Sequence, residues 1–184
     1  MSVIDSFDRV QAAVEPLVEA VKPAQFGDPT PCTEWDVRAL MNHLVHVIIR
    51  YAAIANGLPP PDEADHVGGD PATAFRESGR TAREAFLRPG MLEQPYDAPW
   101  GKIPGSMMVQ HVVNELLAHG WDLARATGQS TDITPDLAAE SLAIWREWSA
   151  HIPRSPGSPF GPEQPAPNGA TAADRLAAFL GRKV

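Results

Sequence analysis

The sequence predicts an all-α fold, a four-helix bundle with long crossover loops and a short C-terminal helix. Apolar residues recur at steps of three and four along several long segments, which is the spacing that places them on one face of a helix. The alternation of apolar and polar residues that marks a half-buried strand is nearly absent. Long amphipathic helices bury their apolar faces against one another, so an antiparallel bundle is the expected architecture.

The first predicted helix begins at Ser2 and ends near residue 21. Pro16 lies inside it and is expected to bend it, because proline cannot donate the backbone hydrogen bond of a helix. Residues 22–32 contain Pro23, Pro29 and Pro31 and predict a connecting loop. The apolar stripe of this helix consists of Val3, Phe7, Val10, Val14, Leu17 and Val21.

The second predicted helix starts at Thr33 and Asp36, a pair with the spacing of a capping box, and continues to Gly57. The loop that follows, residues 58–70, is rich in turn formers and has no periodicity, so we expect it to be exposed. The apolar stripe of this helix consists of Val37, Leu40, Met41, Leu44, Ile48 and Tyr51.

The third predicted helix has Asp70 as its N-cap and Pro71 at its first position, and it ends before the Pro-Gly pair at residues 89–90. Residues 91–105 predict a structured crossover with a short extended pair. Because the connections on both sides of this helix are long, we expect at least one pair of neighbouring helices to run parallel.

The fourth predicted helix runs from Ser106, its expected N-cap, to Gly128, a length of roughly 33 Å at 1.5 Å per residue. Apolar side chains nearly surround it, which predicts that it is the most buried helix of the bundle.

A fifth helix is expected from Thr134 to Ile152, because apolar residues again recur at helical spacing. The prolines of residues 153–167 exclude a helix there and predict a coil. Beyond this coil, Thr171 and Asp174 are expected to cap the short last helix.

Composition and charge favour a single-domain globular protein and disfavour nucleic-acid-binding and membrane proteins. The 184 residues suffice for one sizeable hydrophobic core, so we expect a single domain over residues 1–184. A formal net charge of −8 disfavours binding to nucleic acid, and no apolar run approaches the roughly 18 residues of a membrane span. The first residues lack the apolar core of a signal peptide and Cys32 is the one cysteine, so a cytoplasmic protein without internal disulfides is expected.

The chemistry suggested by the fourth helix centres on Glu115 and His119, which lie about 40° apart around the helix axis and therefore share a face. A carboxylate on so apolar a helix needs a partner, and Arg125, the nearest basic residue of the helix, is displaced by about 80°. A divalent ion held by the carboxylate and the imidazole is one solution. A hydrogen-bonded Glu–His pair without metal is the other.

A third metal ligand would come from a facing helix or loop. His43 flanks the apolar stripe of the second helix, whereas His46 lies opposite that stripe and is expected to face water. His111 is about 12 Å from His119 along the helix, so it can line a pocket but cannot share the ion. The candidates are His43, His46, His66, His111 and His151.

Four sequence runs together resemble a known family. They are PTPCTEWDVRALMNHL at 29–44, DPATAF at 70–75, ELLAHGWDLARATGQ at 115–129 and PFGPEQPAP at 159–167. The combination is similar to actinobacterial metal-binding proteins related to the N-terminal domain of mycothiol-dependent maleylpyruvate isomerase, within the DinB/YfiT-like superfamily. The resemblance implies a DinB-like four-helix bundle. It also implies a metal held by His43 of the second helix and by Glu115 and His119 of the fourth.

The same resemblance implies a function. It suggests a metal-dependent enzyme that uses a small thiol of the mycothiol type for S-transfer or isomerisation, with zinc or nickel as the ion. The characterised isomerase type has a further C-terminal domain, which we do not expect within residues 1–184. The alternatives are a non-catalytic metal-binding or ligand-sequestering stress-response protein, and a bundle that only forms a homodimer. The expected partner is therefore a small-molecule substrate or thiol.

Three further residues each allow two interpretations. Cys32 precedes the second helix, so the helix dipole could make its thiol reactive; the alternative is that it is a small buried side chain that only fills space. Counted along the helix, Cys32 lies about 15 Å from His43, which is too far for its thiol to attack a metal-bound substrate. Trp35 lines the pocket or anchors the packing. Asp122 fixes the imidazole tautomer of a metal ligand, or it pairs with Arg125.

Overall fold

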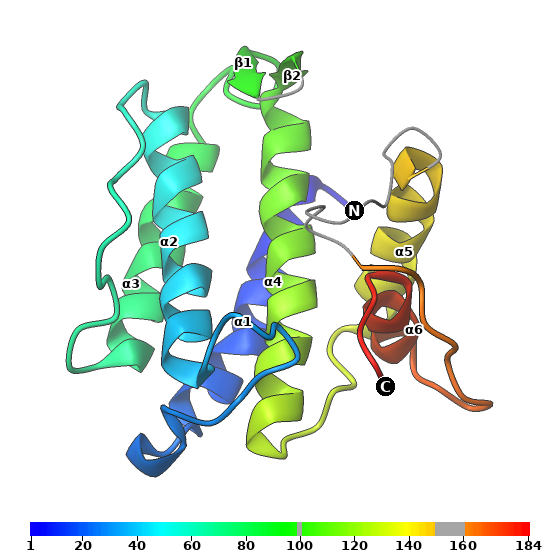
Figure 1. Cartoon of the computed structure of the whole chain (residues 1–184). Coiled ribbons are helices and arrows are strands. Elements are labelled where there is room, and N and C mark those ends of the chain that lie inside the picture. The colour runs from blue at the N-terminus through cyan, green and yellow to red at the C-terminus, as the bar shows by residue number, and fades with distance from the viewer. Residues whose placement is uncertain (99–100, 150–160) are drawn as a thin grey trace.

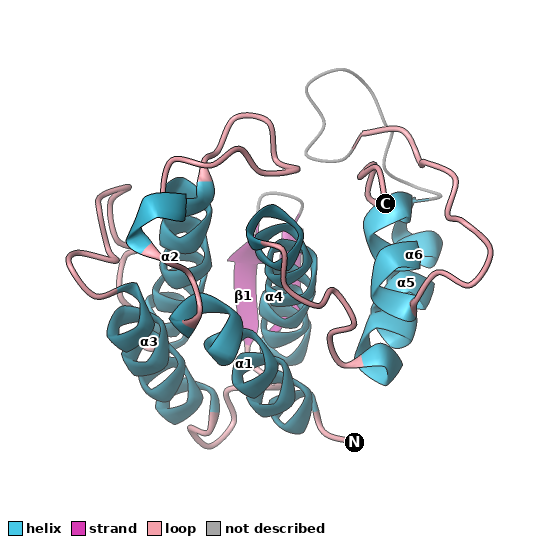
Figure 2. Cartoon of the chain, turned by 90° about the horizontal axis from the view of Figure 1, so that it is seen from below, coloured by secondary structure: helices cyan, strands magenta, loops and turns pink. Residues whose placement is uncertain are grey.

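Helices α1 to α4 form a bundle, and α5 and α6 pack together on the side of α4 that lies away from α2 (Figures 1 and 2). The structure is a computed structural model that describes residues 1–98, 101–149 and 161–184. The mostly helical fold predicted from periodicity is confirmed, and a small antiparallel hairpin joins α3 to α4. The elements are α1 (Val3–Glu19), η1 (Pro23–Gln25), α2 (Val37–Ala55), α3 (Pro71–Phe86), β1 (Pro95–Ala98), β2 (Gly101–Pro104), α4 (Gly105–Thr127), α5 (Pro135–Ser149) and α6 (Ala172–Phe179).

The four helices follow one another around the core in the order α1, α3, α2, α4 (Figure 2). α1 and α3 run antiparallel, because Arg76 near the start of α3 pairs with Glu15 near the end of α1 at 2.6 Å. α2 and α3 run parallel, because Arg88, just after α3, donates to the carbonyl of Ala55, the last residue of α2, at 2.8 Å. The long loop between these two helices therefore returns the chain to the end of the bundle at which α2 begins. The prediction that at least one pair of neighbouring helices runs parallel is confirmed.

Helix α4 is the central helix, since it contacts α1, α2 and α6. Apolar side chains are buried almost all round it, as predicted; they include Val112, Val113, Leu116, Leu117 and Trp121. The indole Nε1 of Trp121 donates to Oδ1 of Asp174 at 2.8 Å, which connects α4 to α6. None of the helices among the described residues is both long enough and apolar enough to cross a membrane.

Several predicted helix ends are confirmed. Ser2 caps α1, Asp70 caps α3 with proline at the first helical position, and Thr171 caps α6. In α6 the side chain of Asp174 accepts from the backbone of Thr171 in return, which completes a capping box. The predicted end of the fifth long helix, Ile152, lies outside the described residues.

The start of α2 differs from its prediction. The helix begins at Val37, and Asp36 is its N-cap, with a side chain that accepts from the amide of Ala39 at 2.8 Å. Thr33 lies before the helix and does not cap it. The reason is that Pro29 and Asp36 pair as an isolated antiparallel bridge, which holds the intervening residues in a turn.

The start of α4 also differs from its prediction. Ser106 lies inside the first turn, because the helix begins at Gly105 with Pro104 in an extended conformation as its N-cap. The amides of Gly105 and Ser106 donate to the carbonyls of Gln94 and Leu92 at 3.0 and 2.8 Å. Backbone carbonyls of the segment just before β1 thus satisfy the start of this helix, and no side-chain cap is needed. The predicted extended pair is confirmed as β1 and β2.

The loop over residues 58–70 is largely exposed, as predicted, but one of its side chains packs into the hydrophobic core. Val67 is buried, and the side chain of Asn42 on α2 holds the loop at two points. Its Oδ1 accepts from the amide of His66 at 2.6 Å, and its Nδ2 donates to the carbonyl of Ala64 at 2.8 Å. The loop therefore lies along α2 (Figure 1).

Helices α1 and α4 approach each other closely at Gly120. A Cβ atom added at this glycine would lie 2.8 Å from Cγ2 of Val14 on α1. Real Cβ atoms almost never come this close to another heavy atom, and valine in a helix has one strongly preferred χ1 rotamer. The glycine is therefore required by packing rather than by its backbone conformation.

We expect Gly120→Ala to lower the free energy of unfolding by about 1–3 kcal/mol, because overpacking outweighs the gain of roughly 1 kcal/mol in helix propensity. Urea denaturation measures this directly. Val14→Ala removes the opposing methyl groups, so the cost of Gly120→Ala should shrink in that background. A Gly120→Ala variant as stable as the wild type would contradict the close approach of the two helices.

Candidate metal centre

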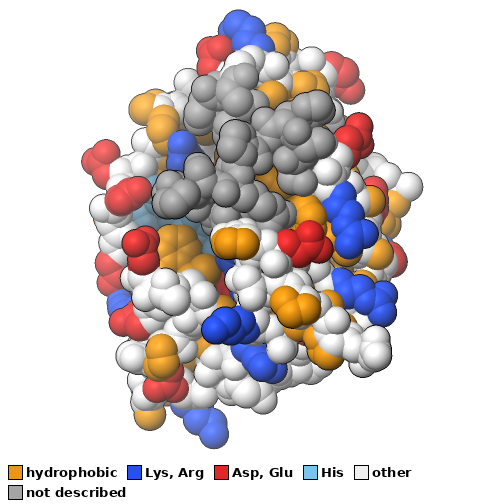
Figure 3. Space-filling view, turned by 45° about the vertical axis from the view of Figure 1, so that its right-hand side comes forward, with side chains coloured by type: hydrophobic (Ala, Val, Ile, Leu, Met, Phe, Trp, Pro, Cys, Tyr) orange, Lys and Arg blue, Asp and Glu red, His pale blue; other side chains and the backbone are white. Residues whose placement is uncertain are grey.

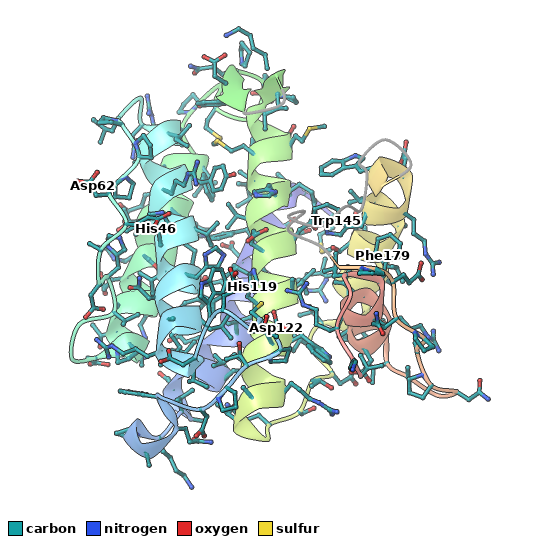
Figure 4. The ribbon with its side chains drawn as sticks, in the orientation of Figure 1. His46, Asp62, His119, Asp122, Trp145 and Phe179 are labelled. Carbon is teal, nitrogen blue, oxygen red and sulfur yellow. The ribbon has the colours of Figure 1, made fainter. Side chains whose placement is uncertain are left out.

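Three side chains that the sequence singled out, His43, Glu115 and His119, meet between α2 and α4. Nε2 of His43 lies 3.1 Å from Oε2 of Glu115, and Nε2 of His119 lies 3.5 Å from the same oxygen. One ligand atom from each of the three residues lies within 4.8 Å of the others. Figure 4 shows His119 on the side of α4 that faces α2. Glu115 and His119 are one helical turn apart, and the packing of α2 on α4 supplies His43.

The donor set fits a divalent ion. With zinc–ligand bonds of about 2.0–2.1 Å, the ligand atoms of a tetrahedral site are separated by about 3.3 Å. The two distances to the Glu115 oxygen, 3.1 and 3.5 Å, lie on either side of this value. The side chains of His43, Glu115 and His119 are 25, 16 and 11% exposed, so the group is largely buried but can be reached from the surface.

The second ring nitrogen of His119 is held by Asp122. Its Nδ1 lies 3.0 Å from Oδ2 of Asp122, a side chain that is fully buried. Burial would raise the pKa of Asp122, but hydrogen bonds from His119 and Arg182 outweigh it and lower this pKa. Of the two interpretations of Asp122, the geometry agrees with the one in which it fixes the ring of His119. Pairing with Arg125 is wrong, because Arg125 is exposed and the basic partner is Arg182.

The charged side chains of the centre are paired with one another. Burial would raise the pKa of Glu115, but hydrogen bonds with His119 and His43 outweigh it and hold this pKa well below its ordinary value. Burial would lower the pKa of His119, but hydrogen bonds with Asp122 and its other neighbours hold this pKa well above its ordinary value. Glu115 is therefore ionised at neutral pH, and His119 carries a proton that a metal ion would have to displace.

Trp35 covers the two imidazoles. Its ring centroid lies 4.4 Å from that of His43 and 5.5 Å from that of His119. The turn that precedes α2 places it there, because the backbone between residues 29 and 36 folds back as a bridge. Trp35 lies against both imidazoles and also packs against the hydrophobic core, so both interpretations of this residue agree with the structure.

Cys32 lies beside His119, which corrects the expectation that it is remote from the centre. Its Sγ is 3.7 Å from Nδ1 of His119, 3.1 Å from Oδ2 of Asp122 and 3.3 Å from Nη2 of Arg182. Counting residues along α2 was misleading because the turn before α2 brings Cys32 to α4. Cys32, His119 and Asp122 form a second group of ligand atoms within 4.8 Å. The guanidinium of Arg182 already supplies the cation there.

The other histidines divide into two sets. His46 is half-buried rather than facing water, because the loop along α2 places Nε2 of His66 3.1 Å from its Nδ1. Burial and the neighbouring His66 lower the pKa of His46. His111 lies next to the candidate centre, with Nε2 3.8 Å from Oε1 of Glu115. His151 lies outside the described residues.

Histidine side chains also reach the molecular surface. In the space-filling view, a histidine surface lies next to hydrophobic side chains on one face of the molecule (Figure 3).

Comparison with known proteins identifies the relatives of this chain. Residues 7–124 match the family described as the mycothiol maleylpyruvate isomerase N-terminal domain. Two uncharacterized proteins of Mycobacterium tuberculosis, from strains CDC 1551 / Oshkosh and ATCC 25618 / H37Rv, are each 38% identical over 187 residues, covering 100% of both chains. A crystal structure of the mycothiol-dependent maleylpyruvate isomerase superposes with a TM-score of 0.63 at 17% identity, covering 80% of this chain and 70% of that chain.

These comparisons agree with the architecture described above. The structural likeness shows the fold, which is consistent with a DinB-like bundle. The family match spans more than half of the chain and includes His43, Glu115 and His119. The chain therefore belongs to the mycothiol maleylpyruvate isomerase N-terminal domain family.

Proposed function

We propose that this protein binds one divalent metal ion, zinc or nickel, through His43, Glu115 and His119, and uses it with a small thiol of the mycothiol type for S-transfer or isomerisation. The observation that carries the proposal is the convergence of three donor atoms from two helices at the separations of one coordination sphere. The thiol part is supported by the family and by its structural neighbour, a mycothiol-dependent isomerase.

The residues around the centre have separate tasks in this proposal. Three protein ligands leave at least one coordination position open, as in catalytic zinc sites. A bound ion would supply Lewis-acid charge that lowers the pKa of a coordinated thiol. Asp122 accepts a hydrogen bond from the Nδ1–H of His119 and keeps Nε2 directed toward Glu115. Trp35 covers both imidazoles and limits the access of water.

The thiol is supplied from outside the chain. Cys32 interacts with the Nδ1 side of His119, whereas the three donor atoms meet on the Nε2 side. Its sulfur also contacts Asp122 and Arg182, and in this proposal Cys32 is a neighbour of the centre and not the attacking nucleophile. A small thiol of the mycothiol type fits this arrangement, because it can occupy an open coordination position.

The first test of this function is metal binding by matched histidine variants. We expect one ion per chain, and His43→Ala should weaken the affinity by at least about 100-fold, since the loss of outer partners alone costs about 10–100-fold. His46→Ala is the control, because His46 is three residues away on the same helix and pairs with His66. Elemental analysis and competition with a chelator measure stoichiometry and affinity. Equal losses in both variants would contradict the assignment of His43.

Metal binding should release a proton from His119. The pKa of this residue is raised well above its ordinary value in the metal-free protein, so at pH 7 the ring is protonated and its Nε2 is not available to an ion. We expect close to one proton to be released per ion at pH 7, and a weaker affinity as the pH falls below the pKa of the ring. Calorimetry in buffers of different ionisation enthalpy counts the protons. Binding without proton release would show that His119 is not the ligand.

The catalytic part of the proposal predicts turnover that depends on both metal and thiol. We expect the zinc- or nickel-loaded protein to convert maleylpyruvate, or to alkylate mycothiol with a simple electrophile, and to lose this activity on chelation and regain it on adding the ion back. Product formation measured by chromatography is the readout. Metal binding without any such turnover would favour the alternative, a non-catalytic metal-binding or ligand-sequestering protein.

A further inference from the structure

The segment after α6 returns to α4 and places the largely buried side chain of Arg182 against Asp122. The side chain of Arg182 is 9% exposed. Its Nε donates to Oδ1 of Asp122 at 3.2 Å and its Nη2 to Oδ2 at 3.0 Å, which is a two-point contact with a fully buried carboxylate. Nη1 donates to the carbonyl of Leu180 at 2.9 Å, and Nη2 also lies 3.3 Å from Sγ of Cys32. All three guanidinium nitrogens are therefore engaged.

The backbone of this segment is fixed as firmly as the side chain. The amides of Gly181 and Arg182 donate to the carbonyls of Ala178 and Ala177 at 3.0 and 2.9 Å, which ties the turn to α6. Gly181 has a φ of 95°, and a Cβ atom on it would lie 2.8 Å from Cα of Gly161. Only glycine fits this turn, and the turn directs the next side chain toward α4.

Asp122 connects Arg182 to the candidate metal centre. Oδ2 of Asp122 is shared by Nη2 of Arg182 and Nδ1 of His119, both at 3.0 Å. A carboxylate that interacts only with the imidazole would be free to rotate about χ2 and to change the direction of the ring. The two-point contact with a planar guanidinium removes this freedom, because both oxygens are held in the plane of the fork.

We propose that Arg182 is a positioning residue for the candidate metal centre: it fixes Asp122, which in turn fixes the ring of His119 with Nε2 directed at Glu115. This inference rests on the function proposed above. It adds a residue that lies 60 positions after Asp122, in the segment after α6, and that would act without being a ligand of the ion. A positively charged side chain that also bonds at two points is needed, so lysine cannot replace it fully.

The test compares Arg182→Gln and Arg182→Lys with Arg175→Gln, a control at an exposed arginine of α6. We expect Arg182→Gln to weaken zinc affinity by about 10–100-fold, the usual cost of losing an outer partner of a ligand. Arg182→Lys should recover part of this loss, and Arg175→Gln should match the wild type. The absorption spectrum of the cobalt-substituted protein should also change in Arg182→Gln, because it reports the geometry of the ligands. A merely structural role would lower the melting temperature and leave affinity and spectrum unchanged, which would overturn the proposal.

A double-mutant cycle shows whether Arg182 acts through Asp122. We expect Asp122→Asn to weaken zinc binding, and the addition of Arg182→Gln to that variant to cost less than about twofold more. Full additivity would overturn the proposed connection. If Arg182→Gln does not fold, the zinc affinity of Arg182→Lys is the test. An affinity equal to that of the wild type would overturn the proposal, and a weaker affinity in a folded Arg182→Lys protein would support it.

A metal-free measurement separates this inference from the proposed function. In the wild-type protein without metal, the Nδ1 proton of His119 should give a slowly exchanging NMR signal, because it is buried against Asp122. We expect this signal to be lost in Asp122→Asn and in Arg182→Gln, and kept in Arg175→Gln. A wild-type protein that binds no ion would refute the proposed function, and this signal would still decide the role of Arg182. Its persistence in Arg182→Gln would overturn the inference.

Discussion

Glu115 and Asp122 place two negative charges on the most buried helix of the bundle, and much of the surrounding structure compensates them. An isolated buried carboxylate costs several kcal/mol, so each of these side chains needs cationic or hydrogen-bonding partners. His43 and His119 interact with Glu115, while His119 and Arg182 interact with Asp122. These partners come from α2, α4 and the segment after α6. The pairing of the two carboxylates therefore holds three parts of the chain, far apart in the sequence, next to one another.

Helix periodicity was enough to predict most of the fold and the core of the candidate centre. The face of a residue follows from its number in a regular helix, so Glu115 and His119 could be assigned to one face and His43 to the edge of the facing stripe. The structure places their ligand atoms within 4.8 Å of one another. A parallel pair of neighbouring helices was also expected, because a long connection can return the chain to the end where it began, and the structure shows that α2 and α3 are such a pair.

Residues outside helices could not be placed in this way. Arg182, Cys32 and His66 all contact helical residues from segments without periodicity, and no spacing rule gives their position. Arg125 was considered a partner of Asp122 because it is near in sequence, although the true partner is far away along the chain. Helix starts were misplaced for a related reason, because the hydroxyl side chains of Thr33 and Ser106 suggested caps. Instead, Asp36 caps α2 after the turn that the bridge to Pro29 closes, and backbone carbonyls of the segment before β1 hold the start of α4.

The order of the helices around the core has a consequence for how the protein folds. The antiparallel neighbours, α1 with α3 and α2 with α4, are each separated by another helix in the chain, so their contacts are non-local. Bringing His43 to Glu115 closes a loop of 72 residues, for which chain entropy alone costs about 4 kcal/mol. Such a topology is expected to fold more slowly than an up-and-down bundle of the same length. An ion that bridged these two residues would act as a reversible cross-link between the first and second halves of the bundle, and its availability would then govern how long the folded state survives.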